Sequence, residues 1–189
     1  MNHAHEYRCA WAHGELMEAY HDHEWGRPVH DDAQLYEMLV LEGFQAGLSW
    51  YIVLSKREAF RKAFANFQPE AIAAFDDADV ARLLADPAIV RNRLKVLGTI
   101  ANARVFLDIR KEFGTFDRYL WGFAPDGPIV SREDVFPTRT ALSDAVSADL
   151  KKRGMKFVGS VTIYSYLQSV GIVNDHEQHC FVMGQLVAP

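Results

Sequence analysis

Apolar residues recur along this chain three and four positions apart, the spacing of helices that bury one face. Alternation with a period of two, which would indicate strands, is not evident. The pattern predicts helices over residues 15–20, 31–42, 76–85, 94–113, 116–121, 143–153 and 160–170, with further helices beginning after Ser49 and at Pro69. The sequence therefore predicts an all-α fold.

Polar residues and glycines indicate where several of these helices begin and end. Asp31 and Asp32 can cap the helix that starts there, and Ser49 and Ser143 can cap two others. Gly154 is placed to end the helix that Ser143 begins.

The length of 189 residues suits one domain, residues 1–189, with a core of its own. The main irregular stretch, residues 124–138, is interpreted as a linker or a surface loop. If it is a linker, the domain has two lobes, about 31–120 and 1–30 together with 137–189.

The composition is that of an ordinary globular protein, with 49% hydrophobic and 24% charged residues. No apolar run reaches the length of a membrane span, and the first eight residues lack the apolar region of a signal peptide, so we expect a cytoplasmic protein. The net charge of −5 argues against general polyanion binding but leaves room for a local basic face.

A single carboxylate, Glu42, lies inside the longest apolar tract, residues 35–54. Burying a carboxylate without a partner is costly, so this side chain needs a partner or an open cleft. Gly43 and Gly47 flank it and Trp50 follows, a combination that suggests a pocket for a flat, hydrogen-bonding ligand, either cationic or neutral. The alternative is a tight turn between helices with Glu42 exposed.

Two predicted helices near the C-terminus are separated by Gly154 to Gly159, with basic residues around the turn. A helical hairpin of this kind presents free backbone N–H groups and can hold a DNA phosphate. The alternative is a plain helical hairpin with a solvated basic face. Three further basic residues offer a second phosphate contact: Arg91, Arg93 and Lys95.

Cysteines and histidines near both ends of the chain suggest a metal site. His176 and Cys180 are four residues apart, which would place them on one face of a helical turn, and Cys9 and His21 lie near the N-terminus. Four such ligands would close a structural zinc site that joins the two ends. The other histidines are rival ligands: His3, His5, His13, His23, His30 and His179.

Four segments together resemble 3-methyladenine DNA glycosylase I, a family of helix-hairpin-helix DNA repair enzymes. These segments are residues 20–26, 41–50, 151–159 and 173–176. They are spread over almost the whole chain, which makes the resemblance specific. Phe44 and Met155 depart from the residue types that are usual at their positions in the family.

The resemblance implies a structural zinc ion on Cys9, His21, His176 and Cys180. It implies a base pocket in which Glu42 is the catalytic and base-binding carboxylate, with Trp50 and Tyr20 as aromatic walls. It also implies DNA contacts at Gly47, Leu48, Gly154, Lys156 and Gly159.

The implied activity is excision of 3-methyladenine from alkylated double-stranded DNA by base flipping. Because no lysine accompanies Glu42, we expect hydrolysis without strand cleavage. We expect a monomer without an organic cofactor. We interpret Asp175 as a cap for the turn that bears His176, since the family works without an essential aspartate there. One alternative is a non-enzymatic helix-hairpin-helix protein that binds damaged DNA, and another is a metallohydrolase with catalytic zinc.

Overall fold

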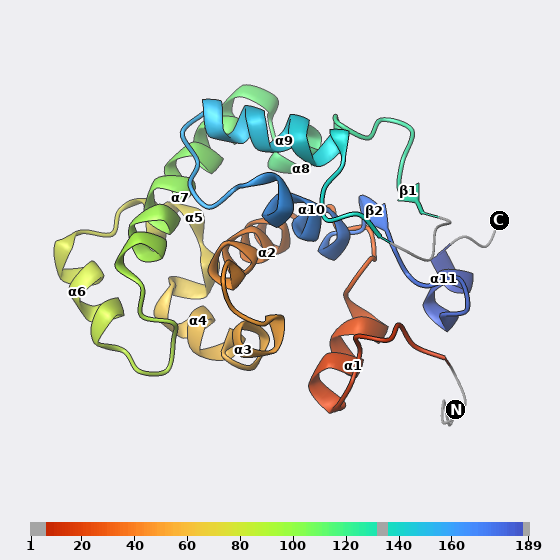
Figure 1. Ribbon diagram of the computed structural model, residues 1–189. Helices are drawn as coiled ribbons and strands as arrows, with labels where there is room; N and C mark the ends of the chain where they lie inside the picture. Colours follow the sequence, from red (N-terminus) through yellow and green to blue (C-terminus); the bar gives the residue numbers. More distant parts are fainter. Residues whose placement is uncertain (1–6, 132–135, 187–189) are drawn as a thin grey trace.

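The computed structural model describes residues 7–131 and 136–186, which form a mostly helical protein (Figure 1). Its elements in chain order are α1 (Glu15–His23), α2 (Asp32–Gln45), α3 (Trp50–Ser55), α4 (Arg57–Ala63), the 3-10 helix η1 (Ala65–Phe67), α5 (Pro69–Ala73), α6 (Asp77–Ala85), α7 (Arg93–Phe113), α8 (Phe116–Trp121), β1 (Ile129–Val130), α9 (Ala141–Lys152), α10 (Ser160–Ser169), β2 (Val173–Asn174) and α11 (Phe181–Leu186). The predicted helices exist, with ends that differ by a few residues, except that the single helix expected after Ser49 is divided at Lys56 into α3 and α4.

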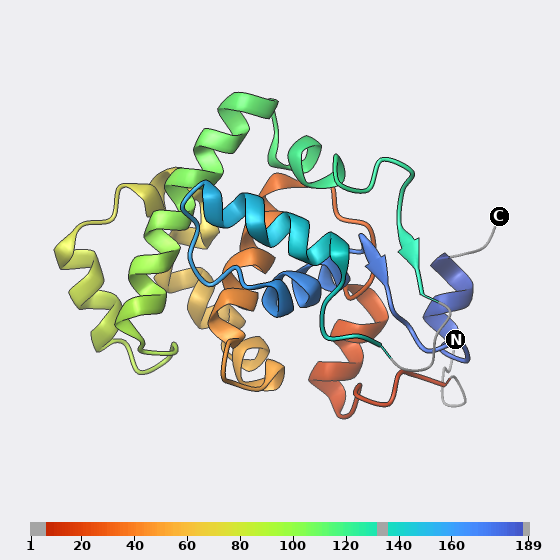
Figure 2. The ribbon, with the colours of Figure 1, turned by 45° about the horizontal axis from the view of Figure 1, so that its top comes forward.

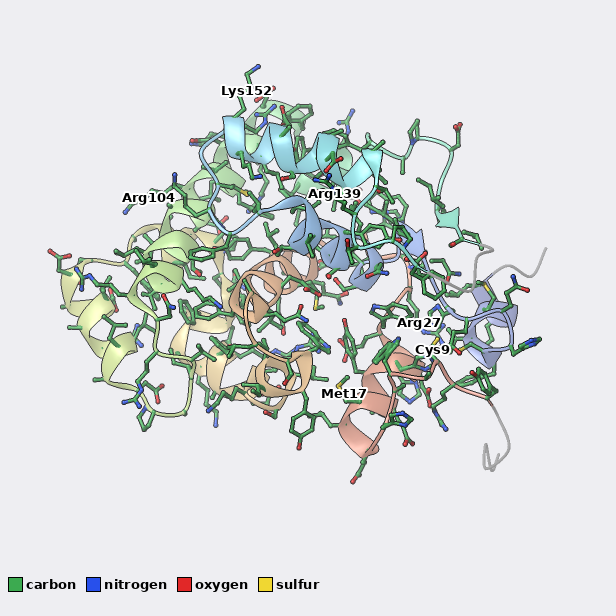
Figure 3. The ribbon with its side chains drawn as sticks, in the orientation of Figure 1. Cys9, Met17, Arg27, Arg104, Arg139 and Lys152 are labelled. Atoms are coloured by element: carbon green, nitrogen blue, oxygen red, sulfur yellow. The ribbon has the colours of Figure 1, made fainter. Side chains whose placement is uncertain are left out.

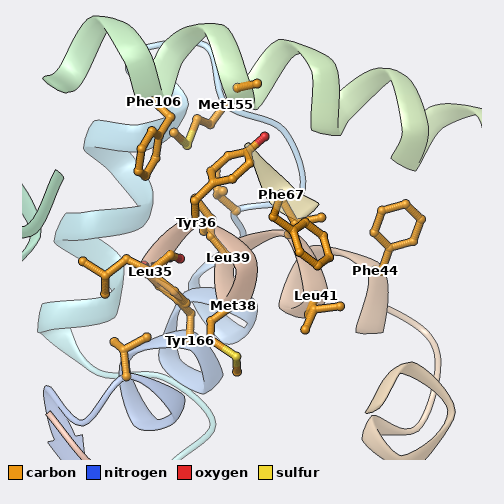
Figure 4. Packing of buried hydrophobic residues seen from close by; sticks show 14 of the residues in the cluster. Leu35, Tyr36, Met38, Leu39, Leu41, Phe44, Phe67, Phe106, Met155 and Tyr166 are labelled. Carbon is orange, nitrogen blue, oxygen red and sulfur yellow. Dashed lines mark hydrogen bonds between the residues drawn. The ribbon is translucent and has the colours of Figure 1, made fainter. Parts of the chain in front are cut away.

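Helix α2 is the centre of the fold and is buried over most of its surface (Figure 4). It contacts α3, α7, α8, α10 and η1. The Tyr36 hydroxyl donates to the carbonyl of Thr99 at 3.3 Å, and the Tyr166 hydroxyl donates to the carbonyl of Leu35 at 3.0 Å. These bonds satisfy the polar ends of two buried rings and fix α2 against α7 and α10.

Helices α9 and α10 form the predicted hairpin, and α10 packs directly on α2 (Figure 2). Gly154 ends the α9 segment in the left-handed region, with a φ of 104°. Such a φ strongly favours glycine, which explains the residue at this turn. The basic turn of the hairpin is therefore connected, through α10, to α2, the helix that carries Glu42.

The start of α9 differs from the prediction. Thr140, not Ser143, is the N-cap, and the Thr140 side chain accepts from the Ser143 N–H at 3.3 Å. The Ser143 hydroxyl in turn accepts from the Thr140 N–H at 2.9 Å, so the two residues form a capping box. Asp31 caps α2 as predicted, whereas Ser49 precedes α3 without a side-chain capping bond.

A short parallel pair of strands corrects the all-α prediction. Ile129 of β1 lies opposite Val173 of β2, and Val130 lies opposite Asn174. Strands of two residues are too short to give an alternating pattern in the sequence. The pair places the start of the irregular stretch beside the segment that leads to His176.

Helices α1 and α11, from opposite ends of the chain, lie on the same side of the molecule in both ribbon views (Figures 1 and 2). Within the described residues, no helix combines the length and the apolar character needed to cross a bilayer. The division into two lobes stays a prediction.

Candidate functional site

A cavity of about 320 Å³ opens among α1, α2, α3 and α10. Met17 and Cys9, which belong to its lining, mark its place in Figure 3. Aromatic side chains form much of the wall: Trp11, Tyr20, Trp25, Trp50 and Phe136. Three carboxyl groups also line it: Glu42, Asp175 and Glu177. An aromatic cavity with a few polar groups is typical of a site for a small flat ligand.

Glu42 is 4% exposed and faces this cavity from the last turns of α2. Its Oε2 atom is buried and has no hydrogen-bond partner among the described residues. Burial raises the pKa of Glu42 from 4.5 to about 8, because desolvation penalises the charged form. The exposed-turn interpretation of Glu42 is therefore wrong.

Tyr20 and Trp50 meet in the same cavity although α1 and α3 present them. Their ring centroids lie 5.3 Å apart with planes inclined by 47°. The Tyr20 hydroxyl and the Trp50 Nε1 atom are both buried, and neither has a partner in the described part of the chain. Burial, with the nearby Glu42 carboxylate adding to it, raises the pKa of Tyr20 well above its usual value. Glu42 Oε2, the Tyr20 hydroxyl and Trp50 Nε1 are thus three buried polar atoms in one aromatic cavity that a bound ligand could satisfy.

Beside the cavity, three of the four predicted metal ligands form a compact cluster. The sulfur atoms of Cys9 and Cys180 and a ring nitrogen of His21 all lie within 4.8 Å of one another. Both cysteines are free thiols. His21 Nε2 is 3.3 Å from Cys180 Sγ, while His21 Nδ1 is 2.8 Å from the carboxylate of Asp22.

His176, the fourth predicted ligand, lies against this cluster. Its ring centroid is 5.1 Å from that of His21, and its buried Nε2 atom has no partner among the residues described. Burial lowers the pKa of His176 to about 4, so the imidazole is neutral, as a metal ligand must be. Asn174 Oδ1 lies 2.8 Å from the Nδ1 atom and fixes the ring. A β-carbon on Gly26 would come within 2.4 Å of the ring.

The donor set fits zinc: two thiols and two imidazole nitrogens, with the second nitrogen of each imidazole held by a carboxylate or an amide. The predicted helical turn between His176 and Cys180 is wrong, because residues 175–180 form a non-helical turn before α11. The rivals His13, His23, His30 and His179 are exposed, and His3 and His5 lie outside the described residues.

The hairpin turn is held rigidly on α7. Asn102 accepts from the N–H of Lys156 at 2.7 Å and donates to the carbonyl of Lys156 at 2.9 Å. A β-carbon on Gly98 would lie 2.9 Å from the ring of Phe157, so the turn approaches α7 closely at this glycine. The side chain of Lys156 is exposed.

The other predicted DNA contacts are accessible. Gly159 precedes α10, and a β-carbon there would meet nothing within 4 Å. Gly47 adopts a φ of 79° in the exposed turn after α2, and Leu48 beside it is 37% exposed.

Two basic residues are not available for the phosphate contacts suggested by the sequence. Lys95 is buried, and its Nζ atom donates to the carbonyls of Phe44 and Ala46 at 2.7 and 2.6 Å. Arg153 pairs with Glu112 and Asp149, each at 2.6 Å. Arg91 and Arg93 remain exposed.

Sequence reasoning did not identify every residue of the cavity. Trp11 and Phe136 lie in segments without a regular pattern, so no sequence signal pointed to them. Trp25 lies in one of the segments that carry the resemblance. Asp175 was identified, but only as the cap of a turn.

Comparison with known proteins agrees with this geometry. The model of a family described as Methyladenine glycosylase matches residues 11–183. DNA-3-methyladenine glycosylase 1 of Escherichia coli (strain K12) is 45% identical over 177 residues, covering 92% of this chain and 95% of the relative. DNA-3-methyladenine glycosylase of Haemophilus influenzae (strain ATCC 51907 / DSM 11121 / KW20 / Rd) is 41% identical and covers 92% and 96%.

Solved structures give the same result. A crystal structure of 3-methyladenine DNA glycosylase I superposes with a TM-score of 0.90 at 45% identity, covering 93% of this chain and 98% of that one. A structure of the enzyme from Staphylococcus aureus, described as the structural basis of its 3-methyladenine recognition, gives a TM-score of 0.88 at 34% identity, covering 92% and 95%. The chain therefore belongs to the methyladenine glycosylase family.

Proposed function

We propose that this protein hydrolyses the N-glycosidic bond of 3-methyladenine in alkylated double-stranded DNA and leaves the strand intact. The observation that carries the proposal is the aromatic cavity in which Glu42, Tyr20 and Trp50 present buried polar atoms without partners among the described residues. Relatives that match over nearly the whole chain are named for this activity.

The cavity would recognise the base by its charge. An adenine methylated at N3 in DNA is cationic, and its exocyclic amine donates hydrogen bonds. A cationic base beside Glu42 would lower the pKa of this carboxyl group again, so that Glu42 would lose its proton on binding, accept from the amine and supply the opposite charge. Tyr20 and Trp50 would stack against the ring. Unmodified adenine is neutral and would lose the charge interaction. The base would have to leave the duplex to reach this buried carboxylate.

The reaction itself needs little from the protein. The bond between C1′ of the deoxyribose and the base breaks, and its electron pair neutralises the departing cation. A water oxygen bonds to C1′, and the proton that the water loses goes to solvent. Among the residues that the structure describes, no lysine lines the cavity, which supports a water nucleophile rather than a Schiff base.

The helix-hairpin-helix would hold the DNA backbone. The half-buried N-terminus of α10 at Gly159 and the ammonium group of Lys156 would bind a phosphate, in a turn whose shape requires Gly154. Gly47 and Leu48 would enter the duplex where the nucleotide is extruded, since Leu48 is an exposed apolar side chain.

A zinc ion on Cys9, His21, His176 and Cys180 would be structural. Four protein ligands leave no open position for water or substrate, so such an ion would stabilise the fold without taking part in the reaction. The metallohydrolase alternative has no support from this donor set.

Release of free base from methylated duplex DNA tests the proposal. We expect the wild-type protein to release 3-methyladenine, and Glu42→Gln and Trp50→Ala to lose most of this activity while remaining folded. Glu15→Gln, an equivalent change at an exposed site on α1, should keep full activity. Binding of methylated DNA without release of base would contradict the proposal and favour the non-enzymatic damage-binding alternative.

A further inference from the structure

The aromatic corner of the cavity is built by helices from separate parts of the chain. Tyr20 lies on α1, Trp50 begins α3 and Glu42 lies on α2. α1 and α3 lie side by side (Figure 1). The two rings are in contact, with centroids 5.3 Å apart, so the shape of this corner depends on how α1 is placed against α3. A side chain that fixes α1 against α3 would therefore also fix the walls of the cavity.

Arg57 connects these elements. It is the first residue of α4, which follows directly on α3. Its Nε atom donates to the carboxylate of Glu37 on α2 at 2.6 Å, and its Nη1 atom donates to the carboxylate of Glu24 at 2.6 Å. Glu24 is the C-terminal cap residue of α1. One guanidinium group therefore joins the segment formed by α3 and α4 to both α1 and α2.

The guanidinium group of Arg57 is held in place from the α2 side. The side chains of Arg57 and Glu37 are only 14% and 12% exposed. Glu37 also accepts from Arg61 Nε at 2.9 Å, which ties it to α4 a second time. Because the donors of a guanidinium group form a rigid planar fork, the bond from Nε to Glu37 also sets the direction of Nη1. Glu24 thus binds a donor whose position is fixed before α1 is placed.

The other polar attachments of α1 lead away from α3. His21 Nε2 is 3.3 Å from Cys180 Sγ, and Asp22 pairs with Arg8 at 2.8 Å. Both partners belong to the terminal segments of the chain. Within the described part of the chain, Arg57 and Glu24 form the one ion pair that joins α1 to the segment formed by α3 and α4. This pair is therefore placed to control the distance between the walls that Tyr20 and Trp50 provide.

We propose that Arg57 is a positioning residue for base recognition, which holds Glu24 and thereby sets the placement of the Tyr20 ring against Trp50. This inference rests on the proposed glycosylase function. The Glu24 side chain is 45% exposed, and an ion pair of this kind adds little to the stability of a fold. Its effect belongs instead to the fit of the cavity, because small displacements of groups that orient a ligand have large effects on its binding and reaction.

Glu24→Ala tests the proposal, since it removes the α1 end of the connection and leaves Arg57 paired with Glu37. We expect the affinity for free 3-methyladenine to fall about 10-fold, a size typical of coupling within one network. The melting temperature should stay at the wild-type value. Glu58→Ala is the matched control: Glu58 pairs with Arg61 within α4 and its side chain is 74% exposed. This control should keep both the affinity and the melting temperature.

Two further variants separate placement from charge. Glu24→Gln removes the charge but keeps an oxygen that can accept from Arg57, so it should recover most of the affinity that Glu24→Ala loses. Arg57→Met removes the opposite charge and should lower the affinity as Glu24→Ala does. The double variant should bind no more weakly than Arg57→Met alone, because both changes break the same connection. Calorimetric titration with 3-methyladenine measures all four affinities.

The outcomes distinguish this inference from the proposed function. Wild-type affinity in Glu24→Ala, equal losses in Glu24→Ala and Glu24→Gln, or a loss of affinity that follows a lower melting temperature would overturn the role of Arg57. Base release by the wild-type protein would leave the proposed function standing in each case. If Arg57→Met does not fold, the two variants at the exposed Glu24 decide the question. A wild-type protein that neither binds nor releases 3-methyladenine would contradict the proposed function itself.

Discussion

Burial of Glu42 raises the pKa of its carboxyl group, and this shift makes the stability of the fold depend on pH. An unfolded glutamate loses its proton near pH 4.5, whereas the folded one holds it up to about pH 8. Between these values the unfolded state binds fewer protons than the folded state. The contribution of Glu42 to stability is therefore greatest below pH 4.5, falls as pH rises to about 8 and is constant above.

Glu42→Gln should consequently stabilise the folded protein at neutral and alkaline pH. We expect its free energy of unfolding to exceed that of the wild type by up to about 3 kcal/mol at pH 7, with little difference at pH 4.5. Urea unfolding at several pH values measures this. A variant less stable than the wild type at pH 8 would show that Glu42 has a favourable partner in the folded state.

Individual residues differ in how far the sequence could predict them. Glu42 was identifiable because a lone carboxylate in an apolar tract is conspicuous. The burial of Lys95 could not be predicted, because its position beside Arg91 and Arg93 in the sequence indicates an exposed basic cluster. Only the packing of α7 against the end of α2 shows that its ammonium group is buried.

At the scale of elements, Lys95 acts as the C-terminal cap of α2. Its bonds to the carbonyls of Phe44 and Ala46 satisfy acceptors that the helix leaves unpaired, and its charge complements the helix dipole. The turn that carries Gly47 and Leu48 follows directly. Lys95 therefore connects the stability of α2 to the shape of this turn.

Lys95→Met keeps the length of the side chain and removes the donors. We expect the free energy of unfolding to fall by about 2 kcal/mol, because two carbonyls at the end of α2, one of them buried, lose their charged partner. Chemical denaturation measures the change, with Lys62→Met on the exposed face of α4 as the control. Equal stability of the two variants would mean that water molecules donate to the carbonyls of Phe44 and Ala46 when the ammonium group is absent.

The hairpin between α9 and α10 provides a second test at this scale. Lys156→Glu should weaken binding to DNA and reduce the slope of log affinity against log salt by about 1, as expected for one lost phosphate contact. Titrations at several salt concentrations measure the slope, with Lys62→Glu as a control of equal charge. An unchanged slope in Lys156→Glu would show that this lysine does not contact a DNA phosphate.

The elements were largely predictable, and the failures have local causes. α8 spans Phe116–Trp121, as the apolar pattern predicted. The start of α9 was misplaced because Thr140 and Ser143 cap each other, and both residue types favour this position. The strands were missed because two residues cannot show a period.

At the scale of the whole molecule, the cluster of Cys9, His21 and Cys180 brings the two ends of the chain together beside the cavity. Tyr20 and His21 are consecutive on α1, and one side chain enters the cavity while the other enters the cluster. Glu177 adds to this junction, since its carboxylate accepts from the N–H of Ala10 at 2.7 Å. The position of the Tyr20 ring therefore depends on the cluster.

Cys180→Ser should lose zinc, lower the melting temperature and weaken binding of 3-methyladenine, because Tyr20 is displaced when α1 loosens. Metal analysis, thermal unfolding and a base-binding titration measure these three effects. His179→Ala, at an exposed histidine of the same turn, should change none of them. Full zinc content in Cys180→Ser would rule out this donor set.

The meeting of the two ends was the part least accessible to reasoning from residue patterns. Spacing pointed to His176 and Cys180, which are four residues apart, but Cys9 and His21 lie too far from them in the chain for spacing to select the full set. The family resemblance made that selection among the eight histidines. Their convergence depends on how α1 and the segment after α10 pack on α2, which no local pattern encodes.

The two hydrogen bonds by which Asn102 holds the backbone of Lys156 also bear on how the protein would search DNA. In the proposed DNA complex the turn would already have its shape before a phosphate arrives, so ordering it would add no entropic penalty to each encounter. Contacts to successive phosphates could then form and break without any rearrangement of the loop. A repair enzyme that must inspect long stretches of intact duplex for one altered base gains speed from such a turn.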